Sequence, residues 1–107
     1  MIMPESFIVT LVSTLENARI DLEGTIGAQR RTGASVNFEV DLEIPSQLPF
    51  AEMKGKLLEI LKILDERFYS WQDCALQYED RFLAGSETVA DVGAFDGSRL
   101  VVVKEGG

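Results

Sequence analysis

The chain has 107 residues, of which 46% are hydrophobic and 26% charged, and its formal net charge at pH 7 is −8. This length fits a single domain, residues 1–107, with one modest hydrophobic core. The acidic balance leaves no basic surplus to neutralise phosphates. It therefore argues against nucleic-acid binding and favours protein partners with basic surfaces.

The inventory of reactive side chains is short. The chain has no histidine and one cysteine, Cys74. These absences exclude the serine–histidine and cysteine–histidine pairs of nucleophilic enzymes, an intramolecular disulfide and a cysteine-based zinc site. The 18 acidic residues are scattered, and no carboxylate pair stands out. We therefore expect a protein that is not an enzyme, has no catalytic residues and holds no metal or cofactor of its own.

The chain shows no targeting or membrane signal. Its longest apolar runs are only a few residues, too short for a transmembrane helix. The first residues lack the positive region and apolar stretch of a secretory signal. We therefore expect a cytoplasmic protein without membrane insertion.

The first predicted element is a strand over residues 7–14, which are rich in β-branched side chains. Phe7, Val9 and Leu11 alternate with a second set that is also largely apolar, so this strand should be central in its sheet. A bend at residues 15–17 and a second alternating stretch at 19–23 follow, with Ile20 and Leu22 pointing inward.

Residues 24–34 contain three glycines and little pattern, and we interpret residues 24–35 as a loop insertion. Arg30 and Arg31 form the only adjacent basic pair in this acidic chain. They are either part of a solvated loop or a weak contact point for a partner, and the sequence leaves both interpretations open.

The clearest strand covers residues 36–44, where apolar and polar residues alternate strictly. One face of this strand should lie on the core and the other should be wet and acidic. After a break that contains two prolines, helical periodicity predicts a helix from Pro49 to about Leu64, with residues 65–67 exposed. The apolar positions of this helix are Phe50, Met53, Leu57, Ile60, Leu61 and Leu64.

An aromatic cluster, Phe68, Tyr69 and Trp71, follows the predicted helix. Packing against the core is the favoured role, and a platform for a ligand or partner is the alternative. Two short strands are predicted next, at residues 74–78 and 81–83.

The last part of the chain ends in a strand. Residues 88–93 resemble one helical turn that points Val89 and Val92 inward, and Asp96-Gly97 is a turn signal. Residues 100–103 form a short, mostly β-branched apolar run that suits a buried strand. A short tail, residues 104–107, completes the chain.

This element order resembles the ubiquitin-like β-grasp fold. Residues 88–103 (Thr-Val-Ala-Asp-Val-Gly-Ala-Phe-Asp-Gly-Ser-Arg-Leu-Val-Val-Val) resemble the corresponding run of ubiquitin-like proteins. Residues 42–50 and 94–101 are similar to the bacterial YukD-like ubiquitin-like family. The resemblance implies an α+β fold of ββαββ order, with one main helix packed on a mixed sheet of four to five strands.

The sequence ends on Gly106-Gly107, as ubiquitin-like modifiers do. The resemblance implies that a partner activating enzyme would adenylate Gly107 with ATP and Mg²⁺, and that conjugating enzymes would pass it to a target amine as an isopeptide bond. A JAB-type metalloprotease would be a further partner. Glycine lacks a Cβ, so such a tail can thread a narrow channel.

Two alternatives come from the same resemblance. YukD-like proteins of type VII secretion systems are not thought to be conjugated, and this chain would then bind membrane proteins of the secretion system. Sulfur carrier proteins share the glycine ending but receive sulfur as a thiocarboxylate.

A weaker set of partner-binding residues comes from position in the ubiquitin-like fold. Counterparts of ubiquitin's exposed apolar patch fall near Leu76 and Val103, with Tyr78 as a companion, and these residues are either a patch or ordinary core residues. Lys104 and Glu105 alone separate the predicted last strand from the two glycines. They would form the lead-in of a tail that reaches only about 13–14 Å.

Overall fold

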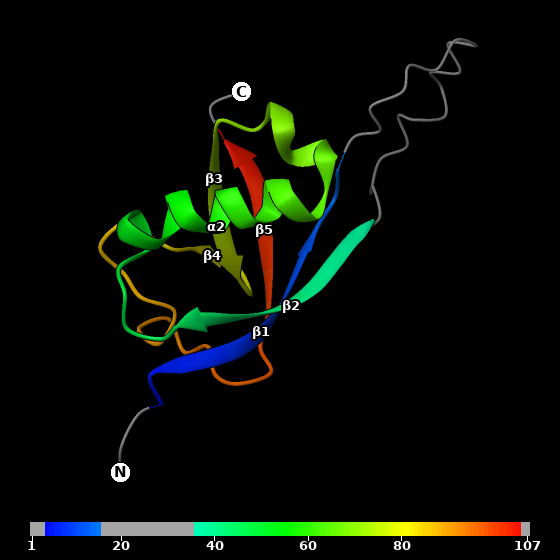
Figure 1. The fold of residues 1–107 in the computed structure, drawn as a ribbon. Helices are drawn as coiled ribbons and strands as arrows, with labels where there is room; N and C mark the ends of the chain where they lie inside the picture. The colour runs from blue at the N-terminus through cyan, green and yellow to red at the C-terminus, as the bar shows by residue number, and fades with distance from the viewer. Residues whose placement is uncertain (1–3, 16–35, 106–107) are drawn as a thin grey trace, which may run out of the picture.

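The computed structural model describes residues 4–15 and 36–105 (Figure 1). The predicted second strand at 19–23, the loop insertion at 24–35, Arg30, Arg31, Gly106 and Gly107 lie outside the described residues. In chain order the described elements are β1 (Ser6–Ser13), β2 (Phe38–Pro45), the helix α2 (Phe50–Leu64), the 3₁₀ helix η1 (Glu66–Ser70), β3 (Asp73–Tyr78), β4 (Arg81–Phe82) and β5 (Arg99–Glu105).

The strands form one mixed sheet of five, in the order β2-β1-β5-β3-β4. β1 and β5 run parallel, and the other neighbours pair antiparallel. The helix α2 lies across one face of this sheet, as Figure 1 shows. The predicted α+β architecture is confirmed. We call the face that α2 covers the inner face and the opposite face the outer face.

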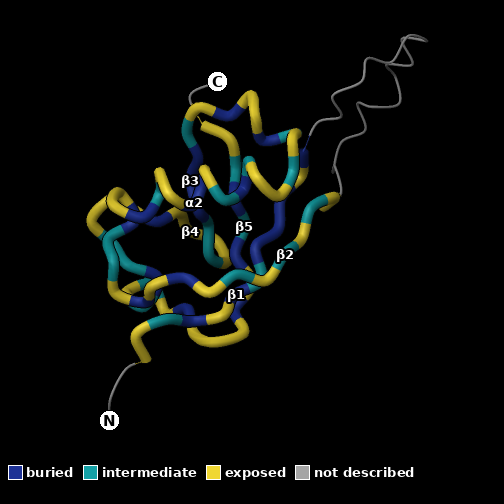
Figure 2. Tube along the Cα trace, viewed as in Figure 1, coloured by how far each residue is buried: buried dark blue, intermediate teal, exposed yellow. Residues whose placement is uncertain are grey.

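β1 lies between β2 and β5, so it is a central strand, as the sequence predicted. Val9 and Leu11 on the inner face are fully buried. On the outer face only Val12, at 1% exposed, is buried, because Thr10 is half-buried and Ile8 is 53% exposed. The buried stretches converge on the sheet under α2 in Figure 2.

β2 confirms the predicted alternation. Its outward residues Glu39, Asp41 and Glu43 are exposed, whereas Leu42 is half-buried and Ile44 is buried against the core. Because β2 is an edge strand with β1 as its only described neighbour, a wet, charged face also discourages further strand pairing.

α2 begins and ends close to the predicted positions. The first amides of a helix have no carbonyl partner within the helix, and here backbone carbonyls of a later loop accept from two of them. Phe50 N donates to Glu87 O at 2.8 Å, and Ala51 N donates to Gly85 O at 2.9 Å. Leu64 has the apolar helical spacing, but it lies in the last turn and is 48% exposed. The helix buries Phe50, Met53, Leu57, Leu58 and Leu61.

The aromatic cluster packs into the core, as favoured. The Phe68 ring is fully buried and meets Phe38 and Trp71 edge to face, with centroid separations of 4.9 and 4.8 Å. Tyr69 is the exception and is 69% exposed.

The predicted exposure of residues 65–67 is wrong for Asp65 and Arg67. The Asp65 carboxylate accepts the Arg67 backbone N–H at 2.9 Å and its guanidinium Nη2 at 2.8 Å. These bonds hold the pKa of Asp65 below its ordinary value, with the guanidinium as the largest cause. Arg67 Nη2 also donates to Asn37 O at 3.3 Å, which ties η1 to the start of β2.

The segment predicted as a helical turn forms a pair of hydrogen-bonded turns instead. Thr88 and Asp91 bond each other's backbone N–H through their side chains, both at 3.0 Å, which favours a closed turn over a continuing helix. Val89 is fully buried, as predicted, and Val92 is half-buried.

The Asp96-Gly97 turn that precedes β5 is confirmed. Gly97 has a φ of +95°, which a residue with a Cβ rarely adopts. Ile8 N donates to Asp96 Oδ1 at 2.7 Å, and Gly97 N donates to Ile8 O at 2.7 Å. The turn therefore fixes where β5 enters the sheet beside β1.

Candidate functional site

β5 is longer than the sequence predicted. It runs from Arg99 to Glu105, with Glu105 opposite Asp73 and Lys104 opposite Cys74 on β3. The predicted tail at residues 104–107 is therefore corrected: its first two residues belong to the strand, because the antiparallel ladder with β3 continues past Val103. Both Lys104 and Glu105 are exposed.

The structure corrects the placement of Leu76. Leu76 lies opposite Val102 on β5, and both side chains are fully buried on the inner face. Because side chains alternate along a strand, the neighbours of Leu76, which are Ala75 and Gln77, are the residues of β3 that point to the outer face. Leu76 is therefore a core residue and is not accessible to a partner of the folded protein.

Tyr78 shares the inner face with Leu76. It is half-buried and packs against the core cluster. Of the three predicted patch residues, only Val103 lies on the outer face, where it is half-buried opposite Ala75. The structure therefore does not bring Leu76, Tyr78 and Val103 together on one surface.

A different apolar row crosses the outer face, and we call it the outer row. Strand register places Val12, Val101, Gln77 and Phe82 side by side on β1, β5, β3 and β4, with Val103 and Ala75 as the next pair. Phe82 is 53% exposed, and Val101 and Val103 are half-buried. The exposure of Phe82 could not be predicted from the sequence, because a two-residue strand is too short to show alternation.

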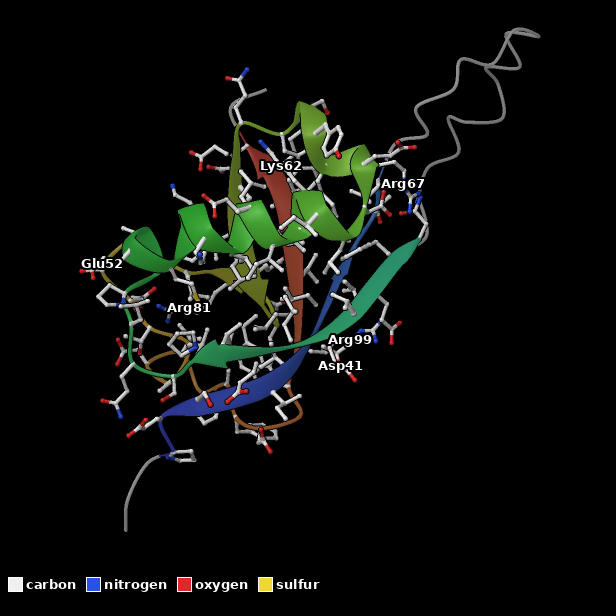
Figure 3. All side chains as sticks on the ribbon, viewed as in Figure 1. Asp41, Glu52, Lys62, Arg67, Arg81 and Arg99 are labelled. Atoms are coloured by element: carbon white, nitrogen blue, oxygen red, sulfur yellow. The ribbon has the colours of Figure 1, made fainter. Side chains whose placement is uncertain are left out.

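Charged side chains border the outer row on the β2 side. Thr10 Oγ1 donates to Asp41 Oδ1 at 2.8 Å, Ser6 Oγ donates to Glu43 Oε2 at 2.5 Å, and Arg99 approaches Glu39 at 4.0 Å. Figure 3 shows Arg99 and Asp41 directed away from α2. The outer face therefore combines an apolar row with an acidic margin, which is the make-up of a protein-binding surface.

Cys74 is the one thiol of the chain, and it is buried. Burial raises its pKa to about 11, and the neighbouring Asp73 carboxylate adds to this shift. Asp73 itself forms an ion pair with Lys54 at 3.1 Å, and hydrogen bonding to Lys54 holds the pKa of Asp73 below its ordinary value. A protonated, buried thiol is a poor nucleophile.

Residues 4–15 and 36–105 contain no group of three or more histidine, cysteine, aspartate or glutamate side chains that could hold a metal ion. The helices in these segments are also too short or too polar to cross a membrane.

Neither a protein-family model nor a curated protein sequence matches the chain. Solved structures do match. Ubiquitin of Caldiarchaeum subterraneum superposes with a TM-score of 0.57 at 13% identity, over 95% of this chain and 96% of that chain. The ubiquitin-like domain of the type VII secretion protein EccD1 from Mycobacterium tuberculosis gives 0.60 at 15% identity, over 92% and 98%.

A third match is a chain of the MycP5-free ESX-5 inner membrane complex, with a TM-score of 0.60 at 12% identity. It covers 97% of this chain and 22% of the longer one. These similarities, with the observed sheet order and helix, show that the chain has the ubiquitin-like fold, as predicted.

Proposed function

We propose that this chain is a non-catalytic, cytoplasmic ubiquitin-like protein that acts by being recognised by other proteins, and that the outer row is its recognition surface. The observation that carries the proposal is Phe82, which is 53% exposed at the β4 end of the outer row, with Gln77 between it and the half-buried Val101. An aromatic ring left more than half exposed on the sheet suits a partner that covers it.

The outer row is testable by substitution. Phe82→Ala removes the exposed ring without touching the core, and Ile63→Ala is the matched control because Ile63 is 82% exposed on α2. For a partner that uses the outer row, we expect Phe82→Ala to weaken the measured affinity about tenfold. Isothermal titration calorimetry should show no change for Ile63→Ala. Equal losses for both variants would contradict the assignment.

Within this class, we propose a bacterial protein modifier attached through Gly107, as in YukD-like proteins that carry a glycine pair. The support is Gly106-Gly107, which follows β5 directly in the sequence. The Gly107 carboxylate would attack the α-phosphate of ATP, bound with Mg²⁺ by the activating enzyme, and release pyrophosphate. An enzyme thiolate would then displace AMP, and a target amine would displace the thiol to form the isopeptide bond.

Mass spectrometry tests attachment. The protein is incubated with a ubiquitin-activating-like enzyme, a conjugating-like enzyme, ATP and Mg²⁺, and a JAB-type metalloprotease is added afterwards. A covalent adduct through Gly107 that is absent after deletion of Gly106-Gly107, and that the protease removes, is the expected result. A mass gain equal to the exchange of one oxygen for one sulfur would favour a sulfur carrier. If the deletion changes nothing, the attachment proposal is wrong.

A second candidate is a YukD-like component of a type VII secretion system that is docked and not conjugated. The specific observation is the similarity to the EccD1 ubiquitin-like domain and to a chain of the ESX-5 inner membrane complex. The partners would then be membrane proteins of the secretion system. Binding to such a membrane complex that survives deletion of Gly106-Gly107 but not Phe82→Ala would favour this candidate over the modifier.

A further inference from the structure

β1 and β5 separate before β5 ends. Their parallel pairing stops at Val12 and Val101, although β5 continues to Glu105. β1 turns instead toward β2, where Asn37 N donates to Ser13 O at 3.1 Å. The Asn37 side chain also exchanges two bonds of 2.7 Å with the backbone of residue 15. Figure 1 shows the two strands diverging toward η1.

The separation leaves a groove between the end of β1, the last residues of β5 and η1, with a volume of about 440 Å³. One wall carries two aromatic side chains, the exposed Tyr69 and the buried Trp71. We call this groove the β5 groove. Its lining includes Ser13, Thr14, Tyr69, Trp71, Val103 and Lys104.

The main-chain groups of Val102 and Lys104 on β5 face this groove, and the Val102 carbonyl already has a donor. Ser13 Oγ donates to Val102 O at 2.7 Å, so the Val102 carbonyl is directed toward β1. Main-chain groups of alternate strand residues point to the same side, so the N–H and C=O of Lys104 also point that way. Cys74, which lies opposite Lys104 on β3, supports this direction of the Lys104 main chain. Its N–H donates to Asp73 Oδ1 at 2.9 Å and not to β5. Among residues 4–15 and 36–105, no strand pairs with Lys104 on the groove side.

Three charged side chains line the groove: Glu66 and Arg67 on η1, and Lys104 at its β5 end. The Lys104 side chain is exposed and forms no ion pair with any residue that the structure describes. Arg67, on the opposite wall, is already paired with Asp65 at 2.8 Å. A ligand that places a carboxylate beside Lys104 would therefore gain an ion pair without breaking one.

We propose that the β5 groove binds an extended segment of a partner protein, which adds as a short strand beside Lys104. The segment would exchange main-chain hydrogen bonds with Lys104, as in other cases of strand addition. It would pack an apolar side chain on Tyr69 and Trp71 and place one acidic side chain beside the Lys104 ammonium. This surface is separate from Phe82, so it adds a second binding mode to the proposed function.

The probe is a peptide selected on the immobilised full chain from a random twelve-residue display library. Selected sequences should alternate apolar residues around one acidic residue. In titrations followed by amide NMR, the largest shifts should fall on Ser13, Tyr69, Val103 and Lys104. Lys104→Pro removes the free N–H and should weaken binding about tenfold or more. Lys104→Ala keeps the N–H and loses the charge, so it should weaken binding only about threefold.

Two further measurements keep the proposal falsifiable if Lys104→Pro disturbs the fold. Tyr69→Ala changes an exposed side chain and should weaken binding about fivefold, whereas Ile63→Ala, which changes an exposed side chain outside the groove, should have no effect. In the free protein, the Lys104 amide should exchange with solvent quickly. Peptides that map to Phe82 or to the β2 edge, a library that yields no binder, or a Lys104 amide already protected in the free protein would each overturn the proposal.

Discussion

The two halves of β5 differ in what holds them. Residues 99–101, the first half, pair with β1, and Val101 also pairs with β3, whereas residues 102–105, the one-sided half, pair with β3 alone among the described residues. The first half follows a turn that is tied to β1 and contributes Leu100 to the core. The second half starts with the buried Val102 and ends with two exposed residues. One strand therefore both completes the fold and, among residues 4–15 and 36–105, has an unpaired edge at its C-terminal end.

The largest expected difference between the halves is in stability. Leu100 is fully buried, and Leu100→Ala should lower the free energy of unfolding by about 3 kcal/mol, because it removes buried apolar area and leaves a cavity. Val103 is only half-buried in the one-sided half, and Val103→Ala should cost about 1 kcal/mol. Urea unfolding at pH 7 measures both, and equal losses would contradict the division.

Cys74 reports whether the one-sided half stays on β3, because it lies opposite Lys104. Burial raises its pKa to about 11, so the thiolate fraction at pH 8 should be roughly 100-fold below that of an ordinary cysteine. A thiol-reactive reagent should therefore modify the native protein at least that much more slowly than the urea-unfolded protein. Modification at the unfolded rate would mean that residues 102–105 leave β3 in the native state.

Ser13 marks the point where the first half, which pairs with β1, ends. Its buried hydroxyl donates to Val102 O in place of a further ladder bond. Ser13→Ala should lower the free energy of unfolding by about 1.5 kcal/mol, because a buried carbonyl loses its donor. Ser6→Ala is the matched control, since the Ser6 hydroxyl bonds an exposed carboxylate, and it should change stability by less than about 0.5 kcal/mol. Thermal unfolding measures the stability of both variants. Comparable losses of stability for Ser13→Ala and Ser6→Ala would contradict the role of the Ser13 hydroxyl.

Asp65 holds the wall of the β5 groove through Arg67. Bonds from the Arg67 guanidinium and backbone lower the pKa of Asp65 in the folded state. A lowered folded-state pKa means that the stabilisation is present above the ordinary value of 3.8 and is lost as the pH falls through the lowered pKa.

Asp65→Asn should therefore lower the free energy of unfolding by about 1 kcal/mol at pH 7, after allowance for solvent screening of the pair. The difference from the wild type should shrink as the pH falls through the lowered pKa of Asp65, because the wild-type carboxylate then also becomes protonated. Urea unfolding at a series of pH values measures this, and a difference that stays constant with pH would contradict the role of the charge.

Much of the fold was predictable because its strands carry a clear period. β2 alternates apolar and acidic residues, so its two faces could be assigned, and α2 repeats apolar residues at helical spacing. β3 was different: Cys74, Ala75 and Leu76 are three consecutive buried residues and carry no period. The direction of Leu76 was therefore not decided locally, and the patch built on it was misplaced.

The β5 groove could not be predicted, because it depends on contacts between distant residues. Ser13 bonds Val102, and Asn37 holds the end of β1 to β2, so β1 leaves β5 only when all three strands are in place. The exposure of Tyr69 between two buried aromatic residues likewise depends on how η1 packs. The glycine pair was visible in the sequence, and its role stays a prediction.

Residue-resolved amide hydrogen exchange along β5 tests the central claim most directly. The amides of Leu100, Val101 and Val103 should exchange only on global unfolding, because each faces a neighbouring strand. The Lys104 amide should exchange at nearly the rate of an unstructured peptide, as expected for a free edge. Protection of Lys104 equal to that of Val103 would show that this edge is already occupied, and would contradict the account.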